Sequence, residues 1–317
     1  MAQPPSSTAR GTALGVLAIV LWSTVFAFSR SLAERLGTLT APTLVLVVGG
    51  GLGCAWTLAR GGLRGLGGMP ARQVLASGGL FVLYQTALYL AVGLAADRRQ
   101  LIEVGIINYL WPGLTLLLAV PLLHCRARAW LAAGMALATA GVVLAMARGG
   151  EVAWDSFRAH LLEHPWPYGL ALVGAVAWAV YSNLARRWVQ GTAPGLVPFF
   201  LLASGLVLGL ARLVRPEQSE WTWPAAAELL YMAAFPALVA YVSWNAAMRT
   251  GRMTLVVALS YATPLLSTLA SSLYLGVRVG SGLWAACGLV VGGAIVCHAS
   301  IREPESRPAV GGGRPPT

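Results

Sequence analysis

Charged residues are scarce in this chain, and lysine is absent from it altogether. Only 10% of its 317 residues are charged and 57% are hydrophobic, with a mean hydropathy of +0.70. In soluble domains about a quarter of the residues are charged, so this composition excludes a soluble protein and predicts a chain that crosses the membrane many times. The net charge of +11 comes from arginines between apolar segments, which indicates helix orientation in a bilayer rather than nucleic-acid binding.

Signatures of catalysis and metal binding are also missing. The chain has no GxSxG, HExxH or phosphate-binding loop. Its four histidines fall at expected helix ends or in a loop, without ligand spacing or acidic partners, and its four cysteines show no CxxC spacing. We therefore expect no catalytic residue, no metal and no cofactor. A membrane-embedded enzyme or a structural scaffold remains the alternative to a transport protein, and an assay for a lipid product would distinguish the two.

Ten apolar stretches are long enough to cross a bilayer, which takes about 20 helical residues. They lie at 12–33, 39–59, 73–94, 100–123, 129–147, 167–187, 194–214, 226–248, 252–275 and 281–300. The fold class predicted is an all-α integral membrane protein with ten transmembrane helices. Its domains are an N-terminal tail at 1–11, a transmembrane repeat at 12–147, a linker at 148–166, a second repeat at 167–300 and a disordered tail at 301–317.

The arginines predict the orientation of these helices. Thirteen of them lie on the side of the N-terminus, the even-numbered loops and the C-terminus, and nine lie on the other side. The cytoplasmic loops of membrane proteins carry an excess of basic residues. We therefore expect both termini to be cytoplasmic and the linker at 148–166 to be periplasmic, in a bacterial inner membrane.

Two stretches place a proline inside an apolar run in the same way. Asn108-Tyr-Leu-Trp-Pro112 and Ser260-Tyr-Ala-Thr-Pro264 align without a gap. A proline frees the carbonyl four residues earlier, and hydrocarbon tolerates a free carbonyl only where it faces protein or a water-filled cavity. Two broken helices in matching places of two halves indicate a central binding site, with the prolines as hinges.

The repeat is also expected to be inverted. Each half holds five helices, and an odd number forces the second half to enter the membrane in the opposite direction. Inverted repeats are typical of alternating-access carriers.

Aromatic residues with polar groups lie about ten residues into several of the expected helices, near mid-membrane. Aromatics of an interfacial belt would lie at helix ends instead. Such residues suit a cavity that stacks planar ligands, and core packing is the alternative. The aromatic candidates are Trp22, Tyr84, Tyr89, Tyr109, Trp111, Trp178, Tyr181, Tyr241, Trp244 and Tyr261. Asn108 joins them because it shares a helix face with Trp111.

Glu103 is the one carboxylate singled out within a membrane segment, a few residues into 100–123. Acidic residues there are rare and are often functional. One interpretation is an interfacial glutamate paired with Arg98 or Arg99. The other is a proton or cation site that couples transport.

Four motifs carry a family resemblance: Leu21-Trp22-Ser23-Thr24, the run from Ile102 to Pro112, Tyr241-x-x-Trp244-Asn245 and Ser260-Tyr261-x-x-Pro264. They resemble the drug/metabolite transporter superfamily in its EamA-type branch, and its aromatic amino acid exporters in particular, over nearly all of 14–299. The resemblance implies export of Phe, Tyr and Trp, and sometimes of flat cationic toxins, through a central cavity. Motif matching implies these cavity residues: Trp22, Tyr84, Tyr109, Trp111, Trp178, Tyr241, Trp244, Ser260 and Tyr261.

Roles follow for these side chains as hypotheses. The substrate ring would stack on Trp22, Trp111 and Trp178. Its ammonium group would meet the hydroxyls of Tyr109 and Tyr261 and the freed carbonyls near Asn108 and Ser260. Its carboxylate would meet polar helix ends or Asn245. We expect the bilayer and the substrate as partners, no nucleic acid, and a monomer, since ten helices can enclose a cavity alone.

The rival within the same superfamily is a multidrug–proton antiporter. In that case Glu103 would exchange protons for cationic drugs, and Glu103→Gln would abolish gradient-driven transport.

Overall fold

The computed structural model describes residues 5–61, 70–146, 154–188, 195–267 and 281–302. Predictions for the ends of both tails, for the first part of the linker (148–153) and for the last part of the stretch 252–275 lie outside the described residues.

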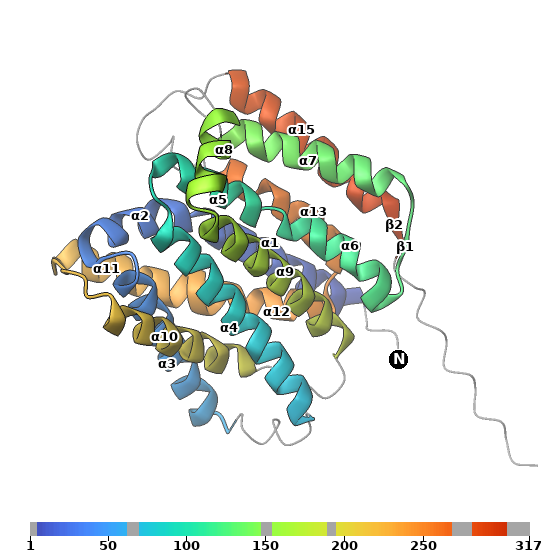
Figure 1. Ribbon diagram of the computed structural model, residues 1–317. Coiled ribbons are helices and arrows are strands. Elements are labelled where there is room, and N and C mark those ends of the chain that lie inside the picture. Colours follow the sequence, from blue (N-terminus) through green and yellow to red (C-terminus); the bar gives the residue numbers. More distant parts are fainter. Residues whose placement is uncertain (1–4, 62–69, 147–153, 189–194, 268–280, 303–317) are drawn as a thin grey trace, which may run out of the picture.

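The described chain is almost entirely helical, as predicted, and Figure 1 shows its helices gathered in one bundle. The helices of the first half are α1 (Pro5–Ser23), α2 (Val25–Leu36), α3 (Thr40–Ala59), α4 (Ala71–Leu94), α5 (Arg98–Asn108), α6 (Trp111–Leu123) and α7 (Trp130–Met146). Those of the second half are α8 (Trp154–Glu163), α9 (Trp166–Arg187), α10 (Leu196–Val214), α11 (Trp223–Met232), the π-helix η2 (Ala233–Val239), α12 (Ala240–Thr250), α13 (Met253–Leu259), the 3-10 turn η3 (Ser260–Ala262) and α15 (Ser281–Ser300). A two-residue ribbon pairs β1 (Arg126–Ala127) with β2 (Ile301–Arg302).

Many of these helices have the length and apolarity needed to cross a membrane. Six spans meet both criteria, at Thr40–Ala59, Ala71–Leu94, Glu103–Leu123, Trp166–Arg187, Leu196–Val214 and Trp223–Thr250. Shorter apolar helices lie at Ser7–Ser23, Trp130–Leu144, Met253–Ser267 and Trp284–Ser300. Each of these helices overlaps one of the stretches expected from hydropathy.

Both proline motifs interrupt their helices at the same register. Helix α5 ends at Asn108, and α6 begins at Trp111 with Pro112 in its first turn. In the second motif α13 passes into η3, and helix resumes over 263–267, again with the proline as second residue. Proline is tolerated there because the first amides of a helix have no partner within it. Each proline therefore starts a new helix segment after an interruption.

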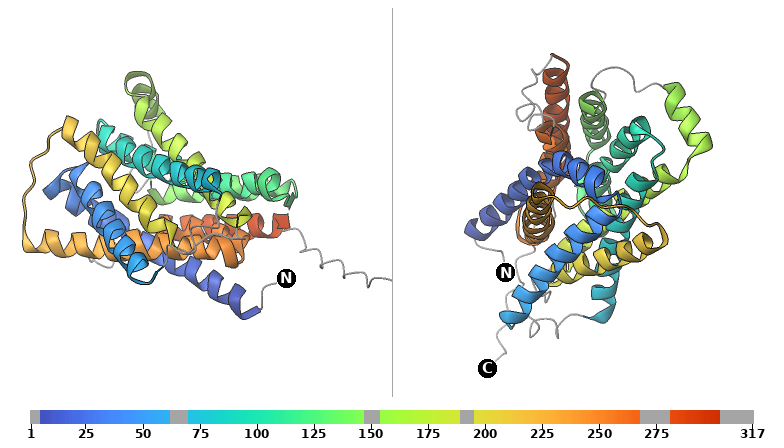
Figure 2. Two further views of the ribbon diagram at one scale, coloured as in Figure 1. Left: turned by 90° about the horizontal axis from the view of Figure 1, so that it is seen from below. Right: turned by 90° about the vertical axis from the view of Figure 1, so that its left-hand side faces the viewer.

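Helices of the two halves pack in pairs. The most extensive contacts join α7 with α15, α3 with α10, α4 with α9 and α1 with α12. Figure 1 shows α7 and α15 lying alongside each other, and Figure 2 shows α8 at the edge of the bundle. The linker expected between the two halves thus contains a helix of its own.

Glycines bring the paired backbones into direct contact, because small residues let helices in a membrane approach closely. A Cβ at Gly293 of α15 would lie 2.4 Å from the backbone nitrogen of Ala138 in α7. A Cβ at Gly50 of α3 would lie 2.4 Å from the backbone nitrogen of Leu202 in α10. Gly288 faces open space instead, so only some of the glycines are needed for packing.

A carboxylate from the second half caps a helix of the first. Glu217, in the connection between α10 and α11, accepts hydrogen bonds from the backbone N–H groups of Leu39 and Thr40, at 2.8 to 3.1 Å. These groups begin α3 and have no partner within that helix. Gly37 has φ of 105°, and a Cβ there would lie 2.2 Å from the Glu217 carboxylate. The turn before α3 therefore requires glycine.

Candidate functional site: an aromatic cluster between the halves

The aromatic residues predicted to line a site converge from five helices. Trp178 of α9 lies at the centre, with ring centroids 5.8 Å from Trp22, 4.7 Å from Tyr84 and 6.3 Å from Trp111. Tyr181 stacks on Trp178 at 5.2 Å and 29°. We call the group the aromatic cluster; its members are Trp22, Phe81, Tyr84, Trp111, Trp178, Tyr181, Tyr241 and Trp244.

Helix α12 supplies the other side of the cluster. The rings of Tyr241 and Trp244 lie 5.1 Å and 5.2 Å from Trp22, and 5.5 Å and 6.0 Å from Trp178. Trp178 and Trp244 are 1% and 0% exposed, so the rings pack against one another in this conformation. A planar ligand among them would replace ring–ring contacts with contacts of the same kind.

The polar atoms at the edge of the cluster are paired mostly with other helices. Trp22 Nε1 donates to the Pro236 carbonyl in η2 (3.2 Å), and Trp244 Nε1 donates to Ser182 Oγ (3.1 Å). Asn245 Nδ2 donates to the Tyr181 hydroxyl at 3.0 Å. The Asn245 amide, proposed from sequence to meet a carboxylate, thus already uses one of its two N–H groups within the protein.

Tyr109 and Tyr261 belong to a separate hydrophobic cluster, formed with α7 and α15. A Cβ at Gly113 would lie 2.6 Å from the Tyr261 hydroxyl. The 3-10 turn of the second interruption therefore packs on the helix that starts at the first one. This contact links the two broken helices, and a larger side chain at Gly113 would disrupt it.

The remaining predicted site residues differ in how well their polar atoms are satisfied. Tyr89 is half-buried against the main core, and Asn108 Oδ1 is buried without a hydrogen-bond partner. Ser260 is buried, and its hydroxyl donates to the Val257 carbonyl at 2.6 Å. The expectation of a free Ser260 carbonyl is wrong in this structure, because the Thr263 hydroxyl donates to it at 2.8 Å.

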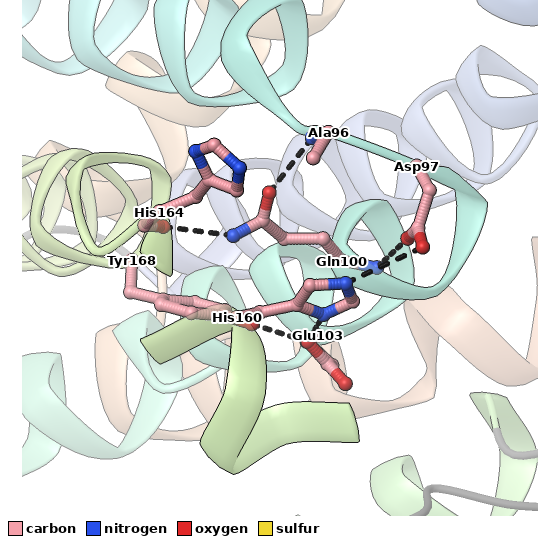
Figure 3. A network of polar contacts seen from close by, with 7 residues as sticks. All are labelled: Ala96, Asp97, Gln100, Glu103, His160, His164 and Tyr168. Carbon is pink, nitrogen blue, oxygen red and sulfur yellow. Dashed lines mark hydrogen bonds and ion pairs between the residues drawn. The ribbon is translucent and has the colours of Figure 1, made fainter. Parts of the chain in front are cut away.

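Glu103 lies in a polar network at the junction of α5, α8 and α9 (Figure 3). It is 5% exposed and accepts a hydrogen bond from the Tyr168 hydroxyl, while His160 Nδ1 lies 3.2 Å from its carboxylate. The other ring nitrogen of His160 lies 3.3 Å from Asp97 Oδ2. The prediction that the histidines lack acidic partners is therefore wrong for His160, because α8 folds back onto α5.

The side chains of Arg98 and Arg99 lie outside the described ones, so the pairing expected for them stays a prediction. Gln100 reinforces the same junction: its Oε1 accepts from Ala96 N at 2.7 Å and its Nε2 donates to the His164 carbonyl at 2.9 Å. In the described chain no group of three or more His, Cys, Asp and Glu side chains could hold a metal ion. In this network the imidazole of His160 joins the carboxylates of Glu103 and Asp97.

Three notable residues were not among the predicted site residues. Phe81 is fully buried and contacts the rings of Trp178, Tyr181 and Tyr241. It has no polar group, which is the feature that marked the predicted aromatic residues. Glu228 is a second acid within a membrane span, with Oε2 buried and unpartnered. Gln85 is 0% exposed beside the aromatic cluster, and it shares a helix face with the predicted residue Tyr89, four positions further along the chain.

This combination of breaks, paired halves and a polar aromatic centre is that of a membrane carrier. The family profile for EamA-like transporters matches residues 165–298. The chain belongs to the EamA-like transporter family; it is a multi-pass membrane transporter and not an enzyme.

Its relatives are more specific. It is 31% identical over 296 residues to the aromatic amino acid exporter YddG of Escherichia coli (strain K12), which covers 93% of this chain and 98% of that one. It is 34% identical over 303 residues to the aromatic amino acid exporter YddG of Ancylobacter novellus, covering 94% of this chain and 100% of that one. A solved crystal structure matches with a TM-score of 0.76 at 29% identity, covering 90% of this chain and 96% of the other.

Proposed function

We propose that this protein exports the aromatic amino acids Phe, Tyr and Trp across the bacterial inner membrane. The observation that carries the proposal is the aromatic cluster, in which rings of five helices meet around Trp178. A substrate ring is aromatic like the rings that it would contact and has the same kind of quadrupole, so such a cluster favours aromatic over aliphatic ligands. The relatives named as aromatic amino acid exporters support the same substrate class.

The proposed architecture is ten transmembrane helices in two inverted repeats of five. The packing supports it: α3 with α10 and α7 with α15 pair helices that hold equal places in the two halves. The contacts α4 with α9 and α1 with α12 exchange partners between the halves, as a two-fold relation requires. We place both termini in the cytoplasm on the basis of the arginine distribution, and we expect the transporter to act as a monomer.

Transport would proceed by alternating access. The rings of the cluster pack together in this conformation, so a substrate enters between them only when the helices of the two halves move apart. Pro112 and Pro264 stand where two helices are interrupted, and these interruptions can absorb the movement. The contact between Tyr261 and Gly113 would make the two interruptions move together.

The substrate's polar groups need partners of their own. Trp22, Trp111 and Trp178 would stack on its ring. The unpartnered Asn108 Oδ1 is an acceptor suited to the ammonium group, together with the Tyr109 and Tyr261 hydroxyls.

The second candidate function is cation–proton antiport, with flat cationic toxins as substrates. It is favoured by one observation, the contacts of buried Glu103 with His160 and Tyr168. Acidic side chains within membrane segments often mark the ion and proton pathways of transporters.

Counterflow in proteoliposomes tests the proposal. Proteoliposomes that contain the purified protein are loaded with unlabelled Phe, and the uptake of labelled Phe is measured in the presence of competitors. Competition by Tyr and Trp but not by Ala or Thr is expected, and no uptake of any aromatic amino acid would contradict the proposal. An imposed proton gradient that drives uptake would favour the antiporter.

Trp111→Ala tests the role of the cluster in the same assay. Loss of one stacking surface should weaken competition by Phe and Trp by about tenfold, an effect of 1–1.5 kcal/mol. Trp130→Ala is the matched control, because Trp130 is 69% exposed and contributes to no ring pair of the aromatic cluster. Equal effects of the two substitutions would indicate that Trp111 has no special role.

A further inference from the structure

Gln85 of α4 has a buried side-chain amide, and one of its two polar atoms has no hydrogen-bond partner. Its side chain is 0% exposed, and its Oε1 accepts a hydrogen bond from the Tyr241 hydroxyl at 2.9 Å. Its Nε2 is buried and has no hydrogen-bond partner. Tyr241 belongs to the aromatic cluster, and Tyr84, the residue before Gln85, lies 4.7 Å from Trp178 between ring centroids. The unpaired amide thus lies at the edge of the cluster.

An amide nitrogen without a partner is costly where water is excluded. Each buried donor that is left unpaired loses about 1–3 kcal/mol, and most buried polar groups in folded proteins are paired. Leu or Met would fill the same volume without this cost. A glutamine at this position is therefore explained if a ligand completes its hydrogen bonds in another state of the transport cycle.

We infer that the Gln85 side-chain amide binds the carboxylate of the transported amino acid. This inference rests on the proposed function and adds one specific contact to it. Nε2 carries two N–H donors and no acceptor, so its partner must be an acceptor. The carboxylate is the acceptor that an amino acid offers beside its ring, and hydrogen bonds to a charged group are the stronger kind.

Two other side chains could compete for this role. Asn245 has one N–H group engaged by the Tyr181 hydroxyl, as described above. Arg249 lies one turn further along α12 and interacts electrostatically with Tyr181. Unlike Asn245, Gln85 has no hydrogen bond from its amide nitrogen to another group. Unlike Arg249, it is adjacent in sequence to Tyr84, whose ring centroid lies 4.7 Å from that of Trp178.

The test separates the carboxylate from the rest of the substrate. Counterflow of labelled Phe is competed with unlabelled Phe and with phenethylamine, which has the same ring and ammonium group but no carboxylate. For Gln85→Met the half-inhibiting concentration of Phe should rise about tenfold, the equivalent of one charge-assisted hydrogen bond. The value for phenethylamine should change less than about twofold. Gln73→Met is the matched control, the same substitution on the same helix outside the aromatic cluster.

A second variant keeps the test informative if Gln85→Met fails to fold. Gln85→Glu has nearly the same volume and can still accept from Tyr241, but it places a negative charge opposite the substrate carboxylate. It should weaken competition by Phe and strengthen competition by phenethylamine, which reverses the wild-type preference. Correct folding is checked by size-exclusion chromatography.

Three outcomes would overturn the inference. In the first, Gln85→Met raises the half-inhibiting concentrations of Phe and of phenethylamine equally. In the second, competition by Phe is unchanged in both Gln85 variants. In the third, the preference for a ligand with a carboxylate is lost in Arg249→Gln instead. Failure of the proposed function looks different, because the wild-type protein itself would then take up no aromatic amino acid.

Discussion

The Glu217 carboxylate joins the second half of the chain to the first, because it caps the start of α3. Besides the N–H groups of Leu39 and Thr40, it accepts hydrogen bonds from the hydroxyls of Thr38 and Thr40, at 3.0 and 2.8 Å. Partial burial would raise the pKa of this carboxyl, but the hydrogen bonds from Thr40 and Leu39 outweigh that effect and lower the pKa below its ordinary value.

The sign of the pH dependence follows from this shift. The folded-state pKa of Glu217 lies below the unfolded one, so its stabilisation is complete above the unfolded value, about 4.3 for glutamate. It is lost as the pH falls through the folded-state pKa, where the folded protein also takes up the proton.

Glu217→Gln keeps the shape of the side chain but removes the charge and turns an NH₂ group toward N–H donors. We expect a loss of about 1–2 kcal/mol, the range found for removal of a helix N-cap. At roughly 2 °C per kcal/mol for a chain of this size, the apparent Tm at pH 7 should fall by roughly 2–4 °C.

The assay is thermal unfolding of the purified protein in detergent at one fixed heating rate, because the apparent Tm of a protein that unfolds irreversibly depends on that rate. Glu220→Gln is the control, because Glu220 lies in the same connection with an exposed side chain. The difference between the wild type and Glu217→Gln should shrink as the pH is lowered through and below about 4.3. Equal Tm values at pH 7, or a difference that grows in acid, would refute the reasoning.

Three further predictions concern packing, movement and coupling. Gly293→Ala should destabilise the protein by about 1–3 kcal/mol, because the new Cβ would lie 2.4 Å from the Ala138 nitrogen, whereas Gly288→Ala, in open space, should leave the Tm unchanged. Pro112→Ala should reduce Phe counterflow severalfold by letting α5 and α6 join, with normal membrane insertion in fractionated cells; full transport would remove the hinge from the mechanism. Glu103→Gln should leave Phe counterflow nearly intact if the protein is a facilitator, and loss of gradient-driven uptake would support the antiporter instead.

Much of the fold could be predicted from the sequence because the bilayer imposes simple rules. A helix must satisfy its own backbone in hydrocarbon, so long apolar runs such as 73–94 coincide closely with helices such as α4 (Ala71–Leu94). The proline at 112 predicted an interruption for the same reason, and α5 ends four residues before it. These are local consequences of composition and backbone chemistry.

Contacts between distant segments could not be predicted in this way. His160 was assigned to a loop without acidic partners, yet α8 brings it against Glu103, a residue 57 positions away in the chain. Gln85 and Tyr241, 156 positions apart, meet because α4 and α12 both face the aromatic cluster. No hydropathy pattern carries that information, because helix pairing depends on the shapes of facing side chains.

The sequence by itself determined the class of protein, the positions of its apolar helices, the two interrupted segments and most of the rings in the aromatic cluster. Tertiary structure alone decided which polar atoms find partners: the Ser260 carbonyl is satisfied by Thr263, while the Gln85 amide nitrogen is not. The reason is physical. Whether a segment enters the lipid depends on its own hydropathy. A hydrogen bond between helices, in contrast, exists only when packing brings a donor within about 3 Å of an acceptor.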